Sequence, residues 1–183
     1  MMNTRLYPAL LFLLLGFSTA AAWAGSHVPI EAFFGHYQGS AVSAAGDEVS
    51  KRDIAVTLKH YRKGFSLKWI TITKRQDGSL KRKEHAVNFV SSGTQNVFAS
   101  AMRTNVFGKA IPMDPLKGDP YVWATLAGKT LTVHALVVTE DFGYEMQTYA
   151  RTLVDGGMTL VFSRIKDGVR LKEITGTLVK TDD

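Results

Sequence analysis

Residues 129–166 read KTLTVHALVVTEDFGYEMQTYARTLVDGGMTLVFSRIK. Apolar and polar residues alternate with a period of two, as at Leu131, Val133 and Ala135, which is typical of strands with one buried face. The turn Asp155-Gly156-Gly157 supplies glycine where a hairpin needs positive φ. This stretch predicts three consecutive antiparallel strands over Thr130–Thr139, Tyr144–Val154 and Thr159–Lys166.

The same alternation, broken by short glycine-containing turns, continues through most of the chain and predicts an all-β antiparallel meander. We expect ten strands, over Phe33–Ser43, Arg52–Tyr61, Phe65–Lys74, Leu80–Val90, Asn96–Arg103, Tyr121–Ala127, Thr130–Thr139, Tyr144–Val154, Thr159–Lys166 and Val169–Lys180. Helix should be scarce, with one turn or a short helix near Pro29–Phe34 or Pro112–Lys117.

A long meander must hide its two edge strands, and closure into an up-and-down barrel removes them. In the last predicted strand Val169 and Leu171 share one face, whereas Ile174 and Leu178 share the other. This change of face predicts a bulge near Lys172–Glu173 that bends the strand around the barrel.

The first 24 residues have the pattern of a signal peptide. The positive charge of Arg5 precedes an apolar run over residues 6–17, and Ala22-Trp23-Ala24 has the small-x-small spacing of a cleavage site. We therefore expect residues 1–24 to be removed and residues 25–183 to form a single β-barrel domain. The apolar run is too short to cross a bilayer, so no transmembrane segment is predicted.

The composition favours a bacterial periplasmic or secreted protein. The chain has no cysteine, which excludes disulfides, thiolate metal sites and the lipid acceptor of lipoproteins. Its net charge is +6. Lysines and arginines cluster at the ends of predicted hairpins, where they protect strand edges or face an anionic envelope surface. Nucleic acid is not an expected partner, because no aromatic-basic stacking motif accompanies the charge.

The start of the first strand, Phe33-x-Gly35-x-Tyr37-x-Gly39, resembles the opening of lipocalins and other calycin barrels, with Tyr37 where tryptophan is usual. Thr139-Glu140-Asp141-Phe142, followed by Tyr144, resembles their Thr-Asp-Tyr turn, and Arg164 lies where they carry a packing arginine. The resemblance implies a cup for a small apolar or amphipathic ligand. It also implies that Gly35, Tyr37 and Arg164 form the closed end, with Arg164 on the Tyr37 ring or bonded to nearby carbonyls.

No motif in the chain predicts catalysis. The five histidines lack a metal-ligand spacing, and no cysteine can complete a site. Gly128-Lys129-Thr130 lacks the upstream glycine of a phosphate-binding loop, and no Gly-x-Ser-x-Gly elbow occurs. We therefore expect no catalytic residue, no metal, no cofactor and no enzymatic activity.

Aromatic residues at strand spacing are the candidates for lining a pocket. The predicted ligand-binding residues are Trp69, Phe98, Trp123, Tyr144, Met146 and Phe162. Tyr149 and Arg151 share the other face of their strand with Glu145 and Gln147 and could together hold a carboxylate or phosphate. Because the face of Tyr144 and Met146 is more apolar, we expect Tyr149 and Arg151 outside the barrel.

Two functions fit these features. One is a non-enzymatic carrier of a small hydrophobic or amphipathic molecule, and the other is an envelope structural or interaction module with a filled barrel and a basic outer surface. An interior cavity of ~300 Å³ or more favours the carrier. The connection over residues 104–120 is either a lid or a plug that closes one end.

Overall fold

The computed structural model describes residues 28–45, 48–75, 77–101, 103–104, 110–111 and 113–182. The predicted signal peptide over residues 1–24 lies outside this part of the chain. So do residues 105–109 and 112 of the 104–120 connection, and the role of this connection as lid or plug stays a prediction.

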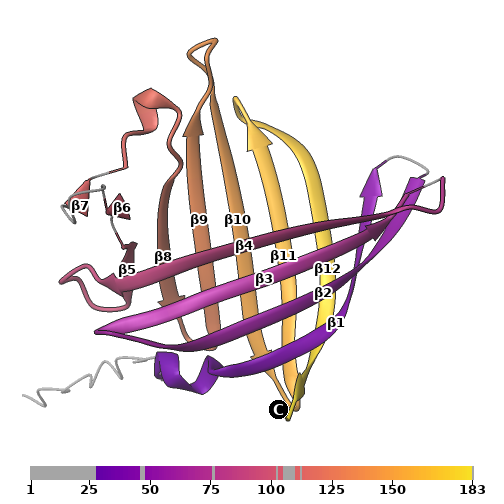
Figure 1. The fold of residues 1–183 in the computed structure, drawn as a ribbon, viewed down its shortest axis with the longest axis horizontal. Coiled ribbons are helices and arrows are strands. Elements are labelled where there is room, and N and C mark those ends of the chain that lie inside the picture. The colour runs from indigo at the N-terminus through magenta and orange to yellow at the C-terminus, as the bar shows by residue number, and fades with distance from the viewer. Residues whose placement is uncertain are drawn as a thin grey trace, which may run out of the picture.

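Ten strands form a closed antiparallel barrel in the order β1-β12-β11-β10-β9-β8-β5-β4-β3-β2 (Figure 1). The elements are η1 (Ile30–Phe33), β1 (Gly35–Ala45), β2 (Glu48–Tyr61), β3 (Gly64–Lys74), β4 (Leu80–Ser91), β5 (Val97–Ser100), β6 (Arg103–Thr104), β7 (Ala110–Ile111), η2 (Pro115–Lys117), β8 (Tyr121–Ala127), β9 (Thr130–Val138), β10 (Tyr144–Val154), β11 (Gly157–Lys166) and β12 (Val169–Thr181).

The predicted closed meander is confirmed. The two additional strands, β6 and β7, pair with each other in a small separate sheet, and β5 is shorter than the predicted Asn96–Arg103 strand. Both predicted helical segments contain a 3₁₀ turn, η1 and η2. The register of β11 with β12 shifts between Arg164 and Ile165, opposite Leu171, which confirms the predicted bulge to within a residue.

The barrel closes where β1 pairs with β12, and Gly39 makes this closure possible. A Cβ atom on Gly39 would lie 2.1 Å from the carbonyl oxygen of Thr177, which precedes its paired residue Leu178 on β12. A side chain of any size would push the two backbones apart, so the close approach requires glycine.

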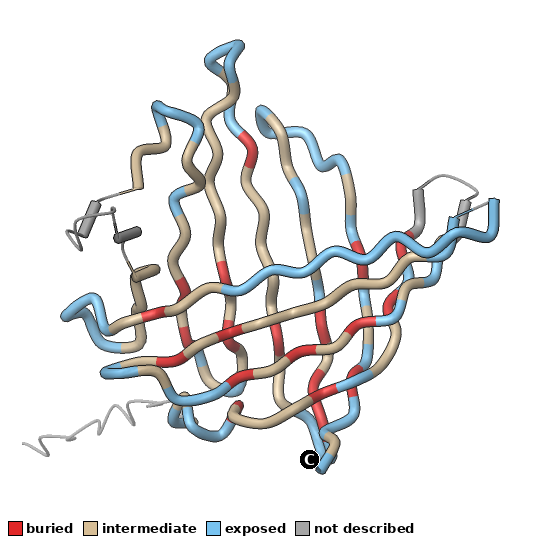
Figure 2. Tube along the Cα trace, viewed as in Figure 1, coloured by how far each residue is buried: buried red, intermediate tan, exposed pale blue. Residues whose placement is uncertain are grey.

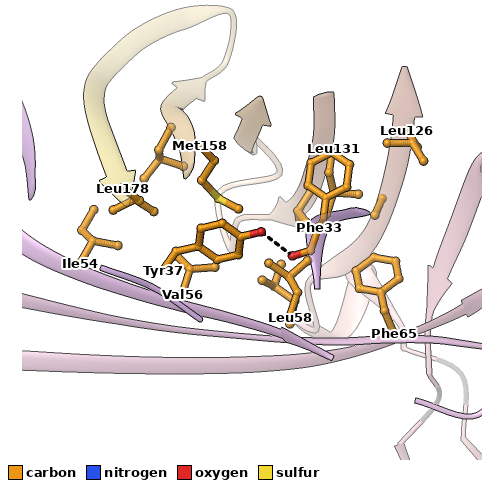
Figure 3. Close-up of a cluster of buried hydrophobic side chains, with 14 of the residues drawn as sticks. Phe33, Tyr37, Ile54, Val56, Leu58, Phe65, Leu126, Leu131, Met158 and Leu178 are labelled. Carbon is orange, nitrogen blue, oxygen red and sulfur yellow. Dashed lines mark hydrogen bonds between the residues drawn. The ribbon is translucent and has the colours of Figure 1, made fainter. Parts of the chain in front are cut away.

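The apolar core fills one end of the barrel, which we call the closed end, and its side chains meet there from η1, β1–β3, β8, β9, β11 and β12 (Figure 3). Its fully buried side chains include Phe33, Tyr37, Leu58, Leu131, Met158 and Leu178. The Tyr37 hydroxyl donates a hydrogen bond of 3.0 Å to the carbonyl of Phe33, which ties η1 beneath the barrel. Beside this cluster, Phe65 stacks on Phe89 with ring centroids 4.8 Å apart.

The wall is different along β4. This strand pairs with β3 along its length but with β5 only over Phe89–Ser91, and its residues from Leu80 to Ala86 are exposed (Figure 2). The exposed half carries Lys81, Arg82 and Lys83, as expected for a protected edge.

Candidate ligand-binding cavity

Between the β2–β4 wall and the β10–β12 wall the barrel encloses a cavity of about 470 Å³. It is lined by Arg52, Ile54, Val56, Trp69, Thr71, Thr73, Arg75, Lys81, Lys83, His85, Gln147, Tyr149, Arg151, Leu160, Phe162, Arg164, Lys172 and Ile174. This lining contains seven lysines and arginines and no aspartate or glutamate. The cavity is therefore strongly cationic.

Strand register divides the cavity into levels. On the β10–β12 wall the deepest level holds Arg151 opposite Leu160, the middle level joins Tyr149, Phe162 and Ile174, and the outer level joins Gln147, Arg164 and Lys172. On the facing wall the corresponding levels are Val56, Trp69 and His85, then Ile54, Thr71 and Lys83, then Arg52, Thr73 and Lys81. Cations thus lie at the floor and around the mouth. Between them Ile54, Phe162 and Ile174 form an apolar belt on the middle level, which Lys83 joins to the rim along β4.

Arg151 is the unusual residue of the floor. Its side chain is 1% exposed, and its Nε has no hydrogen-bond partner. The hydrogen bond that its guanidinium donates, from Nη1 to the carbonyl of Tyr149, is 3.4 Å long. The guanidinium carbon lies 5.5 Å from the centre of the Trp69 ring and 5.7 Å from that of Tyr149. Burial lowers the pKa of Arg151 to about 10, so the group is still charged at neutral pH.

A chain of polar contacts links Arg151's neighbour Tyr149 to the mouth. The Tyr149 hydroxyl donates to Gln147 at 2.8 Å, the Gln147 amide donates to Glu145 at 2.5 Å, and Arg164 donates to the other Glu145 oxygen at 2.5 Å. The hydrogen bond from Arg164 is the main cause that lowers the pKa of Glu145. Glu145 is therefore the partner of Arg164. It lies six residues from Arg151 on β10, or ~20 Å along the strand, which is too far to pair with the Arg151 guanidinium.

The mouth carries a ring of cations, Arg52, Arg75, Lys81, Lys83, Arg164 and Lys172, which we call the rim. The pKa of Lys172 is lowered by burial and then by the positive charges of Arg52, Arg164 and Lys83. These like charges lie close enough to affect one another, and together they create a positive potential at the mouth. This potential attracts an anion that approaches the cavity and repels a cation.

Of the six predicted ligand-binding residues, the structure brings Trp69 and Phe162 to the cavity. Phe98 packs edge-on against Phe65, and Trp123 stacks on His134 at 4.8 Å. Tyr144 and Met146 occupy the opposite face of β10 from Arg151, and neither lines the cavity.

The expectation that Tyr149 and Arg151 lie outside the barrel is wrong. Both line the cavity, because β10 pairs Arg151 with Leu160 and Tyr149 with Phe162, whose side chains face inward. The polar face of β10 is the inner one.

The expected contact of Arg164 with Tyr37 is also wrong. Tyr37 is buried at the closed end, and Gly35 pairs beside it with Leu58. Arg164 instead lies at the far end of β11, where it binds Glu145 at the mouth. The cation above the Tyr37 ring is Lys180, with its Nζ 5.8 Å from the ring centre.

Two further features bear on the class of site. Within the described ranges, no three histidine, aspartate or glutamate side chains gather where they could hold a metal ion. No helix in the same part of the chain is long and apolar enough to cross a membrane.

Comparisons with known proteins give no family. No family model and no curated protein matches the chain. A solved structure with some similarity is that of the S-type phycobiliprotein lyase CPES from Guillardia theta, at 7% identity over 82% of this chain and 89% of that one. Its TM-score is 0.35, which carries no argument about ligand or activity, so the function must be inferred from the cavity itself.

Proposed function

We propose that this chain is an exported, non-enzymatic barrel that binds a small amphipathic ligand in its interior. The observation that carries the proposal is the cavity of about 470 Å³ between the two walls. Small-molecule sites usually enclose ~300–1,000 Å³ and combine apolar walls with a few placed polar groups. The proposal includes the lipocalin-like mode of binding, inside a cup, that the first-strand motif implies.

The lining supports an amphipathic ligand over a purely apolar one. Ile54, Leu160, Phe162 and Ile174 offer apolar surface to a ligand, whereas the floor and rim offer guanidinium and ammonium groups. An apolar segment gains ~25 cal/mol for each Å² that it buries, and polar groups fix its orientation. A structural module with a filled barrel would have side chains in this volume.

Uptake of a neutral fluorescent probe, N-phenyl-1-naphthylamine, tests the proposal. Fluorescence should rise on addition of the wild-type protein and should not rise with Ile174→Trp, which fills the cavity from its middle level. The matched control is Thr175→Trp, one residue along β12 on the exposed face, which should behave as wild type. Absence of uptake by the wild type, or equal uptake by Ile174→Trp, would overturn the proposal.

Export is tested separately with the full chain in a Gram-negative host. We expect the protein in the periplasmic fraction with Gly25 as its first residue. A protein that keeps residues 1–24 and stays in the cytoplasmic fraction would contradict export without bearing on the cavity.

A further inference from the structure

We propose that the ligand is an anionic amphiphile whose oxyanion head binds Arg151 at the cavity floor, its apolar tail lying along the belt toward the rim. This inference rests on the proposed function and names its ligand class. It goes beyond that function because it fixes the charge and orientation of the ligand.

The first step is the unbalanced charge of Arg151. A buried charge is costly unless it is paired and hydrogen-bonded. No carboxylate lines the cavity, and in the described part of the chain Arg151 makes one long hydrogen bond while its Nε makes none. The two aromatic rings nearby compensate only in part, because a ring quadrupole attracts a cation less strongly than a carboxylate does. Arg151 is therefore a buried cation with no carboxylate partner among the cavity-lining residues, and an oxyanion is the group that its guanidinium would bind.

The second step is that the site is already organised to receive this anion. Trp69 and Tyr149 flank the guanidinium, and their own rings lie 5.3 Å apart. Tyr149 is held by Gln147, which is held by Glu145. A guanidinium fixed in this way presents a planar fork of donors that matches the geometry of a carboxylate, sulfonate or phosphate.

The third step is the apolar belt above the floor. Arg151 on β10 pairs with Leu160 on β11. Arg164 follows Leu160 by four residues on β11, which is ~13 Å further along that strand. Phe162 and Tyr149 occupy the intervening level, with rings 4.7 Å apart, and Ile174 is beside them. A head at Arg151 therefore places its tail against apolar side chains.

The rim has a different role from that of Arg151. Two of its cations, Lys81 and Lys83, lie on the exposed half of β4, so they attract an anion without holding it tightly. Rim charges should set the rate of association and its salt dependence, whereas Arg151 should set the rate of dissociation.

Calorimetric titration with four ligands that share one tail tests the inference: decanoate, decyl phosphate, decanol and decylammonium. Wild-type protein should bind at least one of the two anions more tightly than decanol by about tenfold or more, and decylammonium most weakly. The stronger of decanoate and decyl phosphate then distinguishes a carboxylate from a phosphate head.

The key variant is Arg151→Met, which removes the charge and keeps an unbranched side chain. It should lose the preference for anions, while decanol binds as tightly as before or more tightly. Arg151→Lys keeps the charge but not the fork, and should fall between the two. The matched control is Arg82→Met on the outer face of β4, which removes a cation near the mouth but outside the cavity. It should keep the wild-type preference.

The outcomes separate the two proposals. If no ligand of the series and no neutral probe binds the wild type, the proposed function fails. If decanol binds but the anions bind no better, or if Arg151→Met keeps the anion preference, this inference fails while the proposed function stands. Binding of decanol to Arg151→Met also reports that the variant has folded with its cavity intact.

Discussion

The closed end and the cavity end are built from the same strands, yet their inner faces differ in kind. Along β2 the inward residues run Leu58, Val56, Ile54 and Arg52, from fully buried to half-buried. Along β11 they run Met158, Leu160, Phe162 and Arg164, and the last side chain is 45% exposed. Along β12 Leu178 and Ile174 lead to Lys172. On each of these three strands the inward side chains are apolar at the closed end and cationic at the mouth.

Because of this change along the strands, the residues that stabilise the fold and the residues that line the cavity lie at opposite ends of the barrel. The closed end excludes water and contributes most of the hydrophobic free energy of folding. The cavity end leaves apolar side chains facing open space and the buried guanidinium of Arg151 without a carboxylate partner. A folded protein tolerates such a site when the rest of its core compensates. Substitutions at the two ends should therefore have different consequences.

The largest effect should come from deleting a ring at the closed end. Phe65→Ala removes a fully buried ring stacked on Phe89 and should lower the free energy of unfolding by about 3–5 kcal/mol. Phe162→Ala, the same change beside the cavity, should cost about 1–2 kcal/mol because part of its surface already faces open space. Urea denaturation measures both. Equal losses would show that the cavity end is packed as tightly as the core.

The second prediction concerns the seam where the barrel closes. Gly39→Ala forces a methyl group against the Thr177 carbonyl and should cost about 1–3 kcal/mol through displaced backbone. Ser40→Ala, at the next position on the opposite face, is the control and should change stability by less than about 0.5 kcal/mol. Thermal unfolding of both variants checks this. A neutral Gly39→Ala would mean that β1 and β12 can separate without loss.

The fold could be predicted from the sequence because its signals are local. Period-two alternation identifies each strand, and a short glycine turn such as Gly156-Gly157 makes consecutive strands pair as a hairpin. The meander therefore follows without knowledge of distant contacts. The separate pair β6–β7 carries only two residues per strand, too few for alternation to show.

The site could be predicted only in part. Trp69 and Phe162 reach the cavity as predicted, whereas the polarity of the single residues on β10 wrongly predicts that Arg151 lies outside. The hairpin register is the better signal for the buried face. A tight turn at Gly156-Gly157 pairs Arg151 with Leu160, and paired residues share a face. A binding site reverses the usual polarity of a core, so polarity alone misleads there.

The third prediction is that Arg151 lowers the stability of the empty protein. Arg151→Met should raise the free energy of unfolding by about 1–3 kcal/mol at neutral pH, since it removes an unpaired buried charge. The folded-state pKa of about 10 lies below the ordinary value, so the unfolded chain binds more protons between these two values. The contribution of Arg151 to the wild-type free energy of unfolding should therefore become more favourable as pH rises above about 10. The difference in free energy of unfolding between Arg151→Met and the wild type should become smaller over the same range.

Urea denaturation at neutral and alkaline pH measures this difference. Lys63→Met, in the exposed turn between β2 and β3, is the control for loss of one positive charge and should leave stability nearly unchanged. A less stable Arg151→Met would show that the guanidinium contributes net favourable contacts to the ligand-free barrel, so that the cavity end, like the closed end, would be built for stability.

The smallest effect should come from Glu145, the carboxylate bonded to Arg164 at the mouth. Hydrogen bonding lowers the pKa of Glu145, so the contact contributes stability above the ordinary value of about 4.3 and loses it as pH falls through the folded-state value. Because Arg164 is nearly half exposed, Glu145→Gln should cost less than about 1 kcal/mol at neutral pH and nothing in acid. Glu173→Gln, in the exposed pair with Arg170, is the matched control.

Glu145→Gln also tests how the two ends of the polar chain cooperate. Removing this negative charge leaves Arg164 free at the rim, so association of decanoate should become faster by about two- to threefold at low salt. Its dissociation should be unchanged if Gln147 alone keeps Tyr149 beside Arg151. A faster dissociation would mean that the charge of Glu145 orients Gln147 and, through it, the floor. Stopped-flow measurements at two salt concentrations distinguish these results, because only the association rate should depend on screening of the rim.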